Sequence, residues 1–195
     1  GQIAFGNFFR SGKNGNVGFA EIKIIGIVNV KLIVFTVWNQ IADDEQVFKK
    51  QIAFNVLPQV GEFIGEETKF EWAINAETKK VLNGSMKIHA NCAFVPAFIG
   101  AAMYVNAECA NDTDVDEVRK LMQSTKGVVV FDKQTDGGYV SLNDVQGEDN
   151  IYVSRLRQDL SAENGFSFWC VADNLRAGMA KNAFNVMKLM LKTHW

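Results

Sequence analysis

The segment from Val17 to Trp38 places the strongest constraint on the fold, because most of its residues are β-branched or aromatic. Such side chains favour strands, in which successive residues point to opposite faces of a sheet. An even-numbered set is uniformly small or apolar: Ala20, Ile22, Ile24, Val28, Val30, Leu32 and Val34. The odd-numbered positions include four polar residues, Glu21, Lys23, Asn29 and Lys31. The pattern predicts two strands that break near Asn29, with one face in the core and part of the other available to a second sheet.

Five runs further along the chain are also rich in residues that favour strands. They are Met86–Cys92, Ala101–Cys109, Gly127–Lys133, Asn150–Gln158 and Gly165–Ala172. Helical spacing and capping residues predict helices at Asp43–Gln51, at Thr68–Leu82, from Asp114 onward, and at Leu175–Lys192, opened by Asn174. Strands outnumber helices and do not strictly alternate with them. The predicted class is therefore α+β with a mixed, largely antiparallel sheet.

The length of 195 residues suits one domain with a core of its own, and two full domains would be hard to accommodate. Apolar residues make up 48% of the chain and charged residues 22%, as in ordinary globular proteins. We therefore expect a single domain over residues 1–195. Its first 16 residues are rich in glycine and asparagine, which indicates an irregular lead-in.

Charge and hydropathy exclude two classes of partner. The 20 basic and 22 acidic residues give a net charge of −2 with no run of one sign, so neither nucleic acid nor an anionic membrane is indicated. The longest apolar stretch, Ile22–Trp38, contains Lys23, Asn29 and Lys31 and is too short and polar to span a bilayer. No secretion signal is recognisable, so we expect a cytoplasmic protein.

The residues that usually bind metals or cofactors are sparse. Cys92, Cys109 and Cys170 are widely spaced, without a CxxC motif or a paired histidine, so we expect buried thiols and no metal site. No GxGxxG turn for a dinucleotide occurs. His89 and Cys92 are three residues apart on a predicted strand and should point to opposite faces, which argues against a catalytic dyad.

One charged pair falls on a predicted apolar face. Glu77 lies on the same helical stripe as Phe70, Ile74 and Val81, and Lys80 is its neighbour three residues on. An inward-facing carboxylate and ammonium form either a buried ion pair or part of a cleft.

Several segments resemble aspartate-semialdehyde dehydrogenases, in order and at suitable spacing. They are Gln51–Phe63, Thr68–Trp72 with Glu77–Lys80, Val153–Asp159, Ser161–Gly165 and Trp169–Gly178. The resemblance covers about residues 51–192 and concerns the C-terminal substrate-binding and dimerisation domain of that family. It implies helices on one side of the sheet and a homodimer that joins across the sheet. It also implies that Glu77 and Lys80 bind substrate and phosphate, and that Asn182 approaches the nicotinamide.

The departures from the family concern its chemistry. Phe94 stands where the family has an arginine that holds the substrate carboxylate, and Ala101 stands where it has a histidine that acts as acid and base. No cysteine precedes Cys92, so the nucleophile of the family is missing, and Val37–Glu45 replaces a glutamine-containing turn. No nucleotide-binding domain is recognised. We therefore predict no catalytic residues and no cofactor.

Three functions remain open from the sequence. The first is a non-catalytic, engineered domain that acts as a scaffold or homodimer, with residues 1–50 redesigned. The second is a binding protein whose emptied cleft holds a small apolar ligand of unknown identity or presents a grafted recognition surface. The residues that could line such a pocket are Phe94, Phe98, Met103, Phe168 and Trp169. The third, an oxidoreductase fragment with residual activity, has the least support because the required groups must act together.

Overall fold

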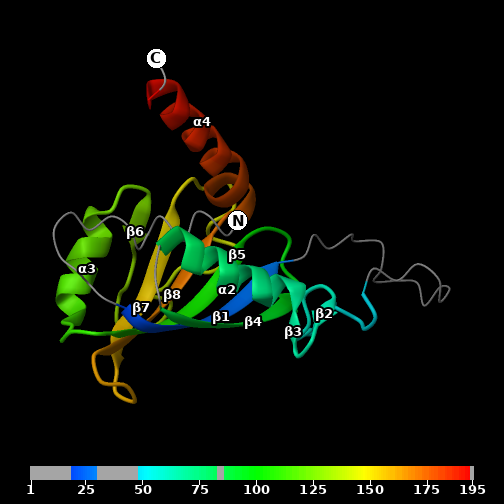
Figure 1. Ribbon diagram of the computed structural model, residues 1–195, viewed down its shortest axis with the longest axis horizontal. Coiled ribbons are helices and arrows are strands. Elements are labelled where there is room, and N and C mark those ends of the chain that lie inside the picture. The colour runs from blue at the N-terminus through cyan, green and yellow to red at the C-terminus, as the bar shows by residue number, and fades with distance from the viewer. Residues whose placement is uncertain (1–18, 30–47, 83–85, 194–195) are drawn as a thin grey trace.

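A computed structural model describes residues 19–29, 48–82 and 86–193 (Figure 1). Its main feature is a sheet of six strands in the order β4-β1-β5-β8-β7-β6. The strands are β1 (Phe19–Asn29), β4 (Lys87–Val95), β5 (Ala101–Cys109), β6 (Val128–Val130), β7 (Ile151–Asp159) and β8 (Gly165–Ala172). Pairs β1–β5, β5–β8 and β7–β8 are antiparallel, and pairs β1–β4 and β6–β7 are parallel. The predicted α+β class and mixed, largely antiparallel sheet are confirmed.

Helices α2 (Lys69–Leu82) and α3 (Val115–Ser124) pack on one face of this sheet. Ile74 of α2 and Met122 of α3 belong to the same buried cluster as Val105, Phe168 and other strand residues. This cluster, the helix-side core, buries the apolar stripe of each helix. The predicted placement of the helices on one side is confirmed.

The N-termini of both helices are capped by side chains that the sequence indicates. The hydroxyl oxygen of Thr68 accepts the N–H of Glu71 at 3.3 Å, and the Glu71 carboxylate accepts the N–H of Thr68 at 2.8 Å. This reciprocal arrangement is a capping box, which satisfies donors that a helix start leaves unpaired. Asp114 caps α3 by accepting the N–H of Asp116 at 2.9 Å.

Among the described residues, only one loop covers the other face of the sheet, and only in part. The loop of residues 131–149 folds over one end, where Val140 and Val145 bury Ala102 and Val171. The remainder carries side chains that alternate with core residues along the strands. We call this remainder the open face, and its described side chains are Lys87, His89, Asn91, Tyr104, Asn106, Glu108, Arg157, Ser167 and Trp169.

The C-terminal helical region departs from the expected geometry. A π-helix, η2 (Asn174–Ala180), leads into α4 (Lys181–Thr193), and its cap is Asp173 rather than the predicted Asn174. Helix α4 projects from the sheet (Figure 1), and most of its apolar side chains are exposed. Its apolar surface thus exceeds what the core of the described residues needs, as the sequence suggested.

Other element boundaries differ from the predictions. The Asp43–Gln51 helix lies mostly outside the described residues, and residues 48–51 are not helical. The first strand ends at Asn29, and the expected second one lies outside the described residues. The hairpin β2 (Phe63–Ile64) and β3 (Glu67–Thr68) was not predicted. None of the described helices combines the length and the apolar character needed to cross a bilayer.

Candidate functional site

Two of the residues singled out in the sequence lie where β4 ends and β5 begins. Ala101, the first residue of β5, pairs with Ala172, the last residue of β8. The preceding Gly100 donates its N–H to the side-chain oxygen of Asn174 at 2.9 Å, which ties this corner to η2. Gly100 has a φ of +111°, and a Cβ there would lie 2.7 Å from a methyl carbon of Leu142. Only glycine fits this turn.

Phe94 is an integral part of the apolar packing at this corner. Its ring is half-buried against the helix-side core and meets Phe48 edge to face, with ring centroids 5.3 Å apart. Its backbone exchanges two hydrogen bonds with Leu57, at 2.8 and 3.0 Å. The position therefore offers a hydrophobic surface and no donor for a carboxylate. Ala101, half-buried nearby in sequence, offers only a methyl group.

The side chains of Glu77 and Lys80 are both exposed on α2, so the prediction that they face inward is wrong. Successive helical residues turn by about 100°, so Glu77 lies about 60° away from the buried Ile74, at the margin of the stripe. Helix α2 is anchored near the end of β4 by Glu71, and Glu77 lies about 9 Å further along the helix axis.

Asn182 is buried to 8% exposure in the first turn of α4, whereas the residues that follow it are exposed. By resemblance it approaches a nicotinamide. The described residues contain no glycine-rich turn that follows a strand and opens a helix, which a dinucleotide would require. The described residues therefore do not provide the phosphate-binding part of such a site.

The cysteines are buried and poor nucleophiles. Burial, with a smaller contribution from the Glu71 carboxylate, raises the pKa of Cys92 to about 12. Burial also raises the pKa of Cys109 and of Cys170. His89 is exposed on the open face while Cys92 is buried on the other, so they form no dyad. Across the described ranges, no three potential metal ligands cluster.

The proposed apolar pocket is not formed. Phe168 is 1% exposed in the helix-side core, whereas its neighbour Trp169 points to the opposite face and contacts Tyr104. Phe98 is 57% exposed. Because adjacent residues of a strand face opposite sides, these aromatic side chains cannot line one cavity, and the predicted lining is wrong.

Sequence reasoning missed the aromatic centre of the open face. The rings of Tyr104 and Trp169 lie 5.0 Å apart between centroids, and Tyr104 is 38% exposed. The indole N–H of Trp169 donates to the carbonyl of Val140 at 2.8 Å, which fixes the ring. The next side chains on this face toward one end of β5 and β8, Asn106 and Ser167, are polar, whereas Trp169 also packs on the apolar cluster of Val140 and Val145. The alternation of core and non-core residues along β5 and β8 is the sequence feature that could have placed Tyr104 and Trp169 on the same face.

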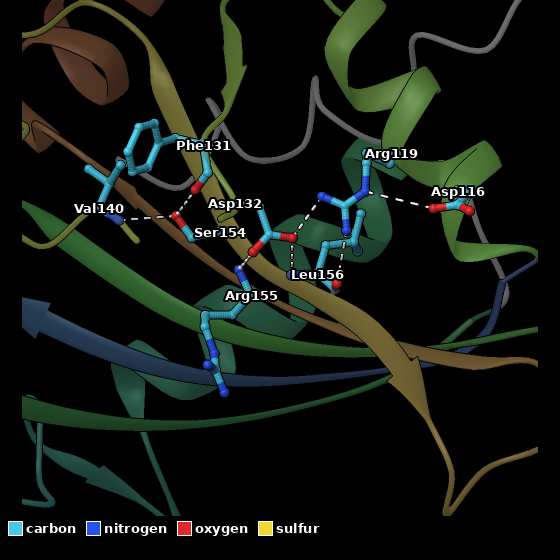
Figure 2. A network of polar contacts seen from close by, with 8 residues as sticks. All are labelled: Asp116, Arg119, Phe131, Asp132, Val140, Ser154, Arg155 and Leu156. Carbon is cyan, nitrogen blue, oxygen red and sulfur yellow. Dashed lines mark hydrogen bonds and ion pairs between the residues drawn. The ribbon is translucent and has the colours of Figure 1, made fainter. Parts of the chain in front are cut away.

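Sequence reasoning also missed a polar network that joins α3 to β7 (Figure 2). Asp132 accepts a 2.7 Å hydrogen bond from the guanidinium of Arg119, and its other oxygen accepts the N–H of Arg155 at 2.7 Å. The hydroxyl of Ser154 donates to the carbonyl of Phe131 and accepts the N–H of Val140. No sequence motif predicts this network, because its residues come from separate elements of the fold.

Comparison with known proteins identifies relatives that all belong to one family. Residues 26–177 match the family described as semialdehyde dehydrogenase, dimerisation domain. Aspartate-semialdehyde dehydrogenase of Rickettsia bellii is 36% identical over 153 residues, covering 76% of this chain and 44% of that protein. The enzyme of Aquifex aeolicus is 34% identical over 149 residues, covering 75% and 44%. The chain thus spans less than half the length of these relatives.

Solved structures agree with the fold. Aspartate semialdehyde dehydrogenase II of Vibrio cholerae superposes with a TM-score of 0.84 at 27% identity, covering 99% of this chain and 59% of that one. A probable aspartate-semialdehyde dehydrogenase of Pseudomonas aeruginosa gives a TM-score of 0.83 at 24% identity, covering 98% and 62%.

Proposed function

We propose that this chain, which belongs to the semialdehyde dehydrogenase dimerisation-domain family, is a self-associating module that forms a homodimer and does not itself carry out acid–base chemistry. The open face of the sheet is the surface through which two copies would join. In a symmetric dimer the same patch of each copy faces its partner, so the patch must be complementary to itself.

The observation that carries this proposal is the aromatic centre of the open face, where Tyr104 is exposed and Trp169 is half-buried. Tyr104 and Trp169 are large, and the bond from Trp169 to Val140 holds the ring in place. Rigid aromatic side chains surrounded by polar groups are typical of residues that dominate binding energy. The polar residues Asn106 and Ser167 lie beside the pair on β5 and β8.

The absence of catalysis is supported by Phe94 and Ala101. At the corner between β4 and β5, a phenylalanine ring packed on Phe48 and a methyl group can neither bind a carboxylate nor transfer a proton. This argument holds equally for an engineered chain and for a natural one.

The proposal is tested by measuring solution mass by light scattering behind a sizing column over a hundredfold range of concentration. We expect the wild type to have a solution mass of twice 21.7 kDa. Tyr104→Ala should raise the dimer dissociation constant about tenfold or more. Trp72→Ala is the matched control, because Trp72 is an exposed aromatic residue on α2, on the other side of the sheet. A persistent wild-type monomer would overturn the proposal.

A further inference from the structure

Helix α4 carries a line of exposed apolar side chains. Phe184, Met187 and Leu191 lie at positions i, i+3 and i+7, so they follow one another along one side of the helix. Among the described elements α4 packs mainly on η2, which leaves this line uncovered. The same spacing is used by helices that anchor in an apolar surface of a partner.

The charges on α4 are all of one sign. The helix contains Lys181, Lys188 and Lys192 and no acidic residue. Lys181 bonds Asp149, whereas within the described ranges no ion pair engages Lys188 or Lys192. The ammonium of Lys188 lies 4.4 Å from the centre of the Phe184 ring, so positive charge borders the apolar line directly. A surface that complements this helix therefore combines apolar side chains with carboxylates.

The hairpin of β2 and β3 has this complementary composition. Residues 61–68 contain three glutamates and no basic residue. Glu62 and Glu66 are exposed, and no ion pair among the described residues engages them. Phe63 and Ile64, which lie between them in the sequence, are also exposed. The hairpin thus offers a small apolar surface flanked by carboxylates.

The two elements extend from the same end of the sheet. Strands β1, β4 and β8 all finish at this end, because β1 is parallel to β4 and β5 is antiparallel to both β1 and β8. Helix α4 follows β8 through η2. The hairpin leads into α2, whose Glu71 accepts the N–H of Cys92 near the end of β4.

Helix α4 and the hairpin are nevertheless separated within one chain. In the sheet order β4 and β8 are three strand spacings apart, which corresponds to about 14 Å. Figure 1 shows α4 projecting at the top of the molecule and the hairpin at its right-hand side. The acidic surface that α4 requires is therefore present on every copy but faces a different direction from α4.

We propose that α4 of one copy packs against the β2–β3 hairpin of a second copy, so that Lys188 and Lys192 face Glu62 and Glu66. The proposal rests on the homodimer proposed above and adds a contact outside the open face. A two-fold axis that passes between the two elements brings each of them to the other element of the partner. The contact then occurs twice, and the assembly closes at two copies.

Charge reversal tests this contact. The helix variant combines Lys188→Glu with Lys192→Glu, and the hairpin variant combines Glu62→Lys with Glu66→Lys. Each variant alone brings like charges together at both contacts. We therefore expect the dimer dissociation constant of each, measured by sedimentation equilibrium at low salt, to rise about tenfold or more. High salt should narrow the difference from the wild type, because ions screen exposed charges.

An equimolar mixture of the two variants provides the decisive measurement. In a mixed dimer opposite charges face each other again at both contacts, so its dissociation constant should return to about the wild-type value. The matched control combines Lys120→Glu with Lys126→Glu, which changes the net charge as the helix variant does, at exposed positions in and just after α3. The control should keep the wild-type constant.

The outcomes separate the two proposals. If both variants dimerise like the wild type, or if the mixture dimerises no more tightly than the separate variants, the contact is overturned and the homodimer stands. A monomeric wild type overturns both. Should the helix variant lose helical circular dichroism signal, Lys188→Gln with Lys192→Gln replaces it, and a salt-dependent weakening of about threefold or more then decides.

Discussion

At the scale of single residues, Glu71 joins α2 to the sheet. One carboxylate oxygen accepts the N–H of Cys92 at 2.8 Å, and the other accepts the N–H and hydroxyl of Thr68 at 2.8 and 2.9 Å. Burial alone would raise the pKa of Glu71, but these hydrogen bonds outweigh it and hold the pKa below its ordinary value. Ionised Glu71 therefore stabilises the folded state.

Glu71→Gln should lower the free energy of unfolding by about 1–3 kcal/mol at neutral pH, because bonds to a charged acceptor are lost. A lowered folded pKa gives stability that is present above the unfolded pKa and lost as pH falls through the folded pKa. The variant should thus lose less stability than the wild type below about pH 4.5. Urea unfolding across pH measures both effects, with exposed Glu117→Gln as control. Equal acid sensitivity in the wild type and Glu71→Gln would contradict this role.

The buried thiols give a second prediction at this scale. Because burial raises the pKa values of Cys92 and Cys170, folded protein at pH 8 should react with a disulfide reagent far more slowly than protein unfolded in urea. A raised folded pKa also means that stability is lost as pH rises above the unfolded value of about 8.5. Rapid reaction of the native protein with the reagent would contradict the burial of Cys92 and Cys170.

At the scale of elements, Asp173 connects η2 to the loop that covers part of the sheet. One of its oxygens accepts the N–H groups of Leu175 and Arg176, and the other accepts the N–H of Gly147 at 2.8 Å. Asp173 is only 3% exposed, so these bonds lie away from water. Capping and loop attachment therefore depend on one carboxylate.

Asp173→Ala should cost about 2 kcal/mol or more, since it removes a helix cap and leaves buried donors unpaired. It should also speed amide hydrogen exchange at Gly147. Asp144→Ala is the control: Asp144 bonds only Ser141 within the same loop, so Gly147 should keep its protection there. Unchanged exchange at Gly147 in Asp173→Ala would show that the loop is held by other contacts.

Elements with a clear local pattern were predictable. The predicted strands Ala101–Cys109 and Gly165–Ala172 coincide with β5 and β8, because both alternate between a core and a second face. The strand predicted at Gly127–Lys133 is shorter, ending at Val130, because the chain then turns to place Asp132 beside Arg119. That end is set by a contact with α3, which sequence periodicity does not contain.

The candidate site was less predictable than the fold. The sequence analysis placed Glu77 on the apolar stripe of α2. That stripe was drawn too wide, because a side chain about 60° from the centre of the stripe reaches solvent. The left-handed φ of Arg155 is imposed by α3 and Asp132, which are distant in sequence. The contact between exposed Tyr104 and half-buried Trp169 depends on the pairing of β5 with β8, which the sequence does not specify.

At the scale of the whole molecule, the proposed homodimer would couple self-association to stability. In that dimer the open face is hidden only while both copies are folded, so a higher protein concentration should favour the folded state by mass action. The coupling is a property of the pair of copies and does not depend on any single bond. It therefore tests the proposed function without relying on the choice of a particular interface residue.

We expect the melting temperature of the wild type to rise by about 2 °C for each tenfold increase in concentration, given the unfolding enthalpy of two chains of this length. Scanning calorimetry from about 1 to 100 µM measures the slope. Tyr104→Arg should flatten it, because the proposed interface would have to close over a charged side chain, whereas Trp72→Ala should keep it. A wild-type melting temperature that is constant over this range would mean that folding is not linked to a dimer, and the open face would then need another partner.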